Sequence, residues 1–240
     1  MNEKLTQKKK RALTAAFLLL ALAVIVTVLV CTVDVCAIGP ADTAVGLSNL
    51  NAFFRDIIGT HPFFYTLTEA LGVLSILIGL SFAVIGLIQW IRRKSLRRID
   101  GEIWGLAAVY ALLGILYVLF EKVVVNCRPI LEAGQTVPEP SFPSSHTLLT
   151  VAVLGTAVIE WRHLLKRYPR VRTTVTIVGI VLIAVAVIGR FLSGVHWFTD
   201  ILAGFLIGSA IVMAYQTFVI GLMQRDKEKK RRRRIAARKK

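Results

Sequence analysis

The chain has 240 residues, of which 55% are hydrophobic and only 18% are charged, and its mean hydropathy is +0.67. A soluble domain carries about a quarter charged residues, so the composition excludes an ordinary soluble protein. The apolar residues gather into long blocks, which predicts an all-α, polytopic membrane protein. The formal net charge of +16 raises nucleic-acid binding as an alternative.

Six apolar blocks are long enough to cross a bilayer, which takes roughly 17 to 25 mostly apolar residues. The first block is longer than the apolar core of a signal peptide, and no small-residue cleavage site follows it, so we interpret it as an uncleaved helix. The predicted spans are Ala12–Val33, Leu71–Ile91, Ile103–Val125, Ser144–Ile159, Thr173–Gly189 and Thr199–Met223.

Basic residues lie on one side of this six-helix arrangement. The N-terminal segment 1–11, the tail 224–240 and the loops 92–102 and 160–172 hold 26 of the 30 lysines and arginines. The positive-inside rule therefore predicts that both termini lie in the cytoplasm. We expect a multi-pass protein of the plasma membrane. We interpret the basic tail as a topology anchor that contacts anionic lipid headgroups, not as a nucleic-acid-binding arm. The membrane domain between these segments is expected to span residues 12–223.

The opposite side keeps only four basic residues, which are Arg55, Lys122, Arg128 and Arg190. Three of them lie in or beside polar segments at the ends of predicted spans. Because topology disfavours cations there, those retained are expected to bind an anion.

Pro143-Ser144-Ser145-His146 opens the fourth block. Ser144 or Ser145 is suited to cap a helix whose first amides are unpaired, and such amides form a seat for phosphate. The alternative is a plain helix cap beside an interfacial histidine.

Arg190, His196 and Asp200 stand before the sixth block. His196 and Asp200 are four residues apart, so they share a face if the helix has begun there, and a carboxylate on one ring nitrogen makes the other more basic. The alternative is a structural His–Asp pair that caps a helix. Arg128-Pro129 ends the third block, and its guanidinium offers paired hydrogen bonds to phosphate oxygens.

Taken together, Arg128-Pro129, Pro143-Ser144-Ser145-His146 and Arg190-x5-His196-x3-Asp200 resemble the type 2 phosphatidic acid phosphatase and vanadium haloperoxidase superfamily, over residues 70 to 222. Three positions depart from its pattern. The usual lysine position holds Glu121, with Lys122 one step nearer to Arg-Pro. Ser145 replaces a common glycine, and Gly189 replaces a common serine.

The resemblance implies a catalytic core in the later helices and a phosphohistidine mechanism. His196 is then the nucleophile, Asp200 its orienting carboxylate and His146 the general acid and base. Arg128, Arg190, Lys122, Ser144 and Ser145 are the implied substrate-binding residues, and no metal or other cofactor is expected. The implied partner is a phosphorylated lipid on the extracytoplasmic face: phosphatidylglycerophosphate, phosphatidic acid or undecaprenyl diphosphate.

Other functions remain compatible with the sequence. The phosphate could pass to a lipid acceptor instead of water, since the motifs do not separate hydrolase from transferase. A Ser–His–Asp hydrolase using Ser144 or Ser145 is a second alternative, which the arginines disfavour because they suit phosphate better than a neutral acyl group. A non-catalytic lipid-binding or transport protein is a third. The sequence does not indicate an oligomeric state.

Overall fold

The structure, a computed structural model, describes residues 2–131 and 134–238 and is almost entirely helical. Within these residues, six helices are long and apolar enough to cross a membrane, and a seventh, α2, is short. The prediction of an all-α, multi-pass membrane protein is confirmed. The helices are α1 (Asn2–Thr32), α2 (Ser48–Ile58), α3 (Pro62–Arg93), α4 (Gly101–Lys122), α5 (Ser145–Leu164), α6 (Pro169–Leu192) and α7 (Phe198–Arg238).

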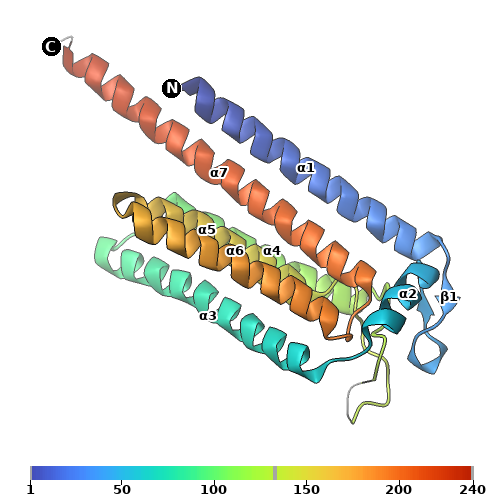
Figure 1. Cartoon of the computed structure of the whole chain (residues 1–240). Helices are drawn as coiled ribbons and strands as arrows, with labels where there is room; N and C mark the ends of the chain where they lie inside the picture. The colour runs from blue at the N-terminus through green and yellow to red at the C-terminus, as the bar shows by residue number, and fades with distance from the viewer. Residues whose placement is uncertain (1, 132–133, 239–240) are drawn as a thin grey trace.

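The long helices run side by side, with both termini at one end of the bundle (Figure 1). Short 3-10 turns connect α3 to α4 (Leu96–Arg98) and α5 to α6 (Leu165–Arg167) at that same end. The opposite end carries α2 and a two-stranded antiparallel hairpin, β1 (Cys36–Ala37) and β2 (Ala44–Val45). The four basic segments therefore gather at the end that holds the termini.

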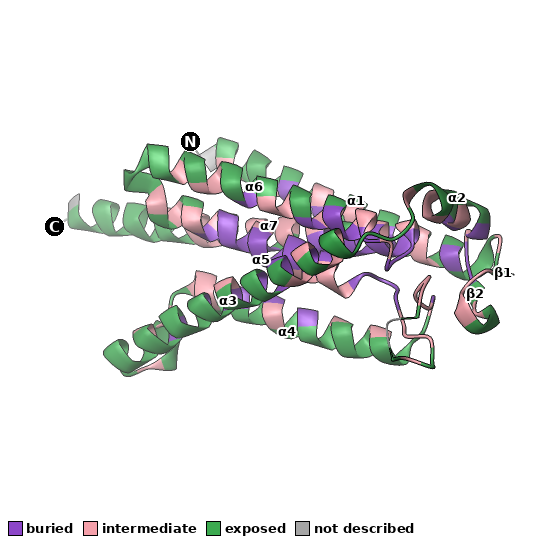
Figure 2. Cartoon of the chain, turned by 60° about the horizontal axis from the view of Figure 1, so that its bottom comes forward, coloured by how far each residue is buried: buried purple, intermediate pink, exposed green. Residues whose placement is uncertain are grey.

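Helix α5 lies at the centre of the bundle and packs against α3, α4, α6 and α7. Its residues Leu148, Ala152, Val153 and Ala157 form the core with apolar side chains of α4 and α7. The outward faces of the surrounding helices are also apolar, and the ribbon there is largely exposed (Figure 2). An exposed apolar surface of this extent is what lipid contact requires.

Two glycines let α7 approach the start of α5. A Cβ atom on Gly204 would lie 2.8 Å from the carbonyl oxygen of Ser144, and one on Gly208 would lie 3.0 Å from Val151 Cβ. Small residues at helix crossings are typical of membrane bundles. Here they bring together two of the three polar segments.

Some helix bounds differ from the predicted spans. Helix α3 begins at Pro62 instead of Leu71, because Pro62 fits the first helical position and the following aromatic residues extend the helix toward the interface. Helix α7 continues through the basic tail to Arg238 instead of ending near Met223, since lysine, arginine and alanine are strong helix formers. Helix α1 likewise begins at Asn2, within the basic N-terminal segment. Helix α2 was not predicted.

Candidate active site

The start of α5 confirms that one of the two serines caps the helix. The Ser144 hydroxyl oxygen accepts hydrogen bonds from the backbone N–H of Thr147 (3.4 Å) and from the Thr147 hydroxyl (3.0 Å). The Ser144 N–H donates to the carbonyl oxygen of Asp200 at 3.0 Å, which joins the starts of α5 and α7. Ser145 occupies the first helical turn, where backbone amides have no partner within the helix.

Asp200 lies in the first turn of α7 and is fully buried. Its Oδ2 accepts a hydrogen bond from the backbone N–H of Trp197 at 3.1 Å, a helix cap, and its Oδ1 accepts from Asn126 Nδ2 at 3.3 Å. Oδ2 also lies 3.6 Å from His196 Nδ1, which is an electrostatic contact and too long for a hydrogen bond. The carboxylate therefore caps its own helix and faces the histidine, and its role in orienting His196 stays a prediction.

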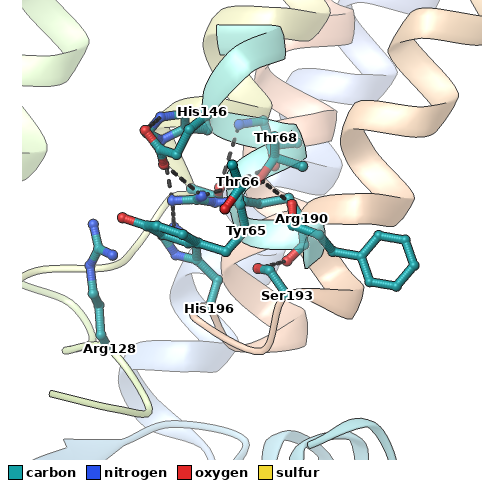
Figure 3. Close-up of polar contacts among 12 residues, drawn as sticks. Tyr65, Thr66, Thr68, Arg128, His146, Arg190, Ser193 and His196 are labelled. Carbon is teal, nitrogen blue, oxygen red and sulfur yellow. Dashed lines mark hydrogen bonds and ion pairs between the residues drawn. The ribbon is translucent and has the colours of Figure 1, made fainter. Parts of the chain in front are cut away.

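Arg190, near the end of α6, lies between the two histidines (Figure 3). Its side chain is only 1% exposed, and its Nη2 lies 3.2 Å from His146 Nδ1 and 3.3 Å from His196 Nε2. A guanidinium only donates hydrogen bonds, so these two ring nitrogens must be the acceptors. We therefore assign the ring proton of His196 to Nδ1, facing Asp200, and that of His146 to Nε2.

His196 lies in the connection between α6 and α7, where its side chain is almost completely buried. Burial, followed by the positive charges of Arg190 and Arg128, holds the pKa of this imidazole well below its usual range. The ring is therefore neutral at neutral pH, with a lone pair on Nε2. A neutral imidazole backed by a carboxylate meets the chemical requirements of a nucleophile.

Arg128 lies in the loop between α4 and α5, and backbone contacts between the two ends of this loop fix its position. The backbone N–H of Arg128 donates to Glu139 O at 2.9 Å, and Cys127 forms a bridge with Pro140. The Arg128 Nε lies 3.4 Å from a Glu139 carboxylate oxygen. The guanidinium approaches the histidines from the loop side of the site (Figure 3).

One acidic side chain at the site was missed by the sequence analysis. Glu69 of α3 places Oε2 at 3.1 Å from His146 Nε2 and Oε1 at 3.0 Å from Arg190 Nη1. It is the only acidic residue in α3, and it lies before the predicted start of that span at Leu71. A lone carboxylate just outside an apolar block is the signal that could have found it.

The structure does not bring Lys122 to these residues. Lys122 is exposed at the end of α4, and among the described residues it is its neighbour Glu121 that borders the site cavity. A shift of one residue turns a side chain by about 100° around a helix, which accounts for the difference. The role of Lys122 in substrate binding stays a prediction without a structural contact.

A cavity of about 760 Å³ extends from the two histidines between α3 and α4. His146, His196, Arg128 and Ser145 line its polar end. Glu121, Glu139, Ser75 and Ser141 also border the cavity. Apolar and aromatic side chains line most of the remainder, among them Leu80, Leu113, Leu116, Tyr117, Phe120 and Leu149. The cavity therefore joins a cationic centre to a wall suited to hydrocarbon. Within residues 2–131 and 134–238, no group of three or more His, Cys, Asp or Glu side chains is arranged to hold a metal ion.

Comparisons with known proteins agree with this architecture. None of the curated proteins matches the chain. A crystal structure described as the first transmembrane PAP2 type phosphatidylglycerolphosphate phosphatase, from Bacillus subtilis, has a similar fold, with a TM-score of 0.58 and 20% sequence identity. The alignment covers 85% of this chain and 94% of that one. The model of the PAP2 superfamily matches residues 102–223, just over half of the chain and all of α5 and α6. The chain belongs to the PAP2 superfamily.

Proposed function

We propose that the protein is an integral membrane phosphatase that hydrolyses a phosphomonoester or diphosphate of a lipid through a phosphohistidine intermediate. The observation that carries this proposal is the convergence of His146 and His196 on the Arg190 guanidinium, at the polar end of an apolar cavity. The two histidines and the buried Arg190 guanidinium suit the phosphate of a phosphorylated lipid, and the apolar wall of the cavity suits its hydrocarbon chain.

In the proposed reaction, His196 Nε2 attacks phosphorus while Asp200 stabilises the imidazolium that develops. Arg190 and Arg128, with the free amides at the start of α5, hold the non-bridging oxygens, where negative charge concentrates in the transition state. His146 protonates the leaving oxygen and then accepts a proton from the water that hydrolyses the phosphohistidine. These groups come from the α4–α5 loop, the start of α5 and the segment from the end of α6 to the start of α7, so the packing of the bundle fixes their spacing.

The cavity supports a lipid substrate over a small phosphate ester. Its apolar length between α3 and α4 would take an acyl or prenyl chain, while the phosphate would sit at the histidines. The bias of basic residues toward the termini supports a site on the extracytoplasmic face. Phosphatidylglycerophosphate, phosphatidic acid and undecaprenyl diphosphate are the proposed substrate candidates.

The contacts of the two serines argue against a serine hydrolase. The buried Ser144 hydroxyl is used by Thr147, and within the described part of the chain neither serine hydroxyl bonds to His146 or His196. A serine nucleophile needs such a bond to a histidine base.

Purified protein in detergent, given each of the three lipids, tests the proposal by the phosphate released. His196→Ala is expected to lower turnover at least about 1,000-fold, because it removes the nucleophile. With a ³²P-labelled lipid, acid-labile and alkali-stable label is expected on the wild-type protein and not on His196→Ala. Undiminished turnover or labelling of His196→Ala would contradict the mechanism. Transfer of label to an added acceptor lipid, without free phosphate, would identify the transferase.

A further inference from the structure

Helix α3 lies outside the segment that the family model matches, yet it presents one continuous face to the site. Tyr65, Thr68, Glu69 and Gly72 are spaced by three and four residues, which places them on the same side of a helix. Figure 3 shows Tyr65 and Thr68 beside Arg190 and the two histidines. The contacts of this face are with Arg190 and His146.

Three members of the face hold Arg190. The Tyr65 ring centre lies 5.5 Å from the guanidinium carbon, a cation–π contact. Arg190 Nη1 lies 3.4 Å from the Thr68 hydroxyl oxygen and 3.0 Å from Glu69 Oε1. A buried cation needs such partners, because burial without them carries a large free-energy cost.

The other contacts of the face fix His146. Glu69 Oε2 lies 3.1 Å from His146 Nε2, and a Cβ atom on Gly72 would lie 3.0 Å from His146 Cδ2. The ring therefore lies against the backbone of α3 at Gly72 while its Nε2 faces the carboxylate. Each of the two site histidines therefore lies beside a different carboxylate. Asp200 faces His196, and Glu69 is bonded to His146.

We propose that Glu69 is a positioning residue for phosphoryl transfer, which holds His146 in the Nε2–H tautomer and fixes the Arg190 guanidinium between the two histidines. This inference rests on the proposed function above. It adds a fourth segment to the site, from a part of the chain without a recognised motif.

The proton transfers leave Glu69 ionised throughout. In the first step His146 enters as the imidazolium, with hydrogen on both ring nitrogens; an N–P bond forms at His196 Nε2, the P–O bond to the lipid breaks, and the leaving oxygen takes the proton from His146 Nδ1. In the second step the water oxygen bonds to phosphorus, the N–P bond breaks, and the proton from water goes to Nδ1. Because Glu69 holds the hydrogen on Nε2, Nδ1 is the nitrogen left for this exchange.

The charges around His146 make the role of Glu69 measurable. Arg190 from α6, Arg128 from the α4–α5 loop and His196 face the ring. Glu121 of α4 and Glu139 of the loop border the same cavity, whereas Glu69 of α3 is bonded to the ring itself. The imidazolium form that protonates the leaving oxygen therefore depends on the negative charge of Glu69. Removing that charge is expected to move the alkaline limb of the kcat–pH profile to lower pH.

Glu69→Gln tests the kinetic part of the proposal, with Asp56→Asn as the matched control, because Asp56 is an exposed carboxylate of α2 at the same end of the bundle. Glu69→Gln is expected to lower kcat on the order of 10- to 100-fold with KM changed less than about 3-fold. Glu69→Asp is expected to restore part of kcat, and Asp56→Asn to behave as wild type. An unchanged kcat and pH profile in Glu69→Gln would overturn the proposal. Retained kcat with tighter substrate binding would also overturn it, since Glu69 would then only compete with phosphate for Arg190.

A second measurement does not depend on turnover. The chain has four histidines, so ¹⁵N-histidine labelling in detergent, with His146→Gln for assignment, resolves the ring nitrogens of His146. The Nε2–H tautomer is expected in the wild type and a mixture of tautomers in Glu69→Gln. The same tautomer in both proteins would overturn the proposal even if no lipid were hydrolysed, whereas failure of the proposed function would appear only in the phosphate assay.

Discussion

At the scale of single residues, the site depends on one guanidinium that contacts two imidazoles. Arg190 donates from the same nitrogen, Nη2, to His146 Nδ1 and His196 Nε2. In the proposed reaction a phosphate oxygen would take over this donor, which would free the two ring nitrogens for bond formation and proton transfer. The contact that the substrate would replace therefore also holds the two histidine rings in place.

The lowered pKa of His196 predicts a pH-dependent stability. The folded protein keeps this ring neutral, whereas in the unfolded chain it binds a proton as pH falls through about 6.5. The unfolded state therefore gains protons first, so the contribution of His196 to stability is lost as pH decreases below that value. His196→Gln has no such group, and its Tm is expected to fall less than the wild-type Tm between pH 7 and pH 5. Parallel Tm curves for the two proteins in detergent would contradict this.

The sequence predicted the residues that carry motifs better than those that support them. His146, His196, Asp200, Arg128 and Arg190 stood out because polar groups at the ends of apolar blocks are costly there. The supporting residues gave weaker signals. Glu69 fell just outside a predicted span, and the role of Asn126, bonded to Asp200 and to the N–H of Gly46, depends on contacts between segments far apart in the chain.

At the scale of helices, the distance between the two histidines depends on how closely α7 approaches α5. Gly204 lies against the backbone of Ser144, the residue that caps α5 two positions before His146. A backbone carbonyl cannot rotate away as a flexible side chain does, so a side chain at position 204 must push the helices apart.

Gly204→Ala is therefore expected to destabilise the protein by about 1–3 kcal/mol and to lower kcat, because the added Cβ would lie 2.8 Å from Ser144 O. The matched control is Gly221→Ala on the same helix, where the nearest atom to a new Cβ would be 3.6 Å away. Tm and phosphate release in detergent measure both effects. Equal Tm values and rates for the two variants would contradict the packing argument.

The six spans were predictable from the sequence because each is a long apolar block, whereas their ends were not. A hydropathy pattern marks where a chain leaves lipid, and a helix ends only where its backbone pairing stops. The backbone of α7 continues as a helix for fifteen residues past Met223. Helix α2 was harder to predict because it is short and because a residue far from it in the sequence satisfies one of its first backbone amides. The Asn49 N–H donates a hydrogen bond to the carboxylate of Asp34, and no residue next to Asn49 indicates this partner.

At the scale of the whole molecule, basic residues occupy one end of the bundle and the candidate site the other (Figure 1). On the basis of the positive-inside rule, we propose that the site faces away from the cytoplasm. Cys36 lies in the exposed hairpin at the site end, and Ser95 lies in the loop between α3 and α4 at the other end.

A membrane-impermeant maleimide is expected to label Cys36 in intact cells. In a variant with Cys31, Cys36 and Cys127 changed to serine, Ser95→Cys is expected to react only after lysis. Both cysteine positions report the side of the membrane without depending on activity. Labelling of Ser95→Cys in intact cells, with Cys36 protected, would reverse the proposed orientation.

The hairpin, α2 and α3 all contact the motif residues from outside the segment that matches the family. Gly46 bonds to Asn126, Asn51 of α2 bonds to Thr199 at the start of α7, and Glu69 bonds to His146 and Arg190. Residues 102–223 contain the two site histidines and the two site arginines, whereas Gly46, Asn51 and Glu69 lie outside this range. We therefore expect the motif-bearing half not to function when transplanted alone. A chimera that joins it to the first three helices of a relative would contain every motif but would lack these contacts from the hairpin end, α2 and α3.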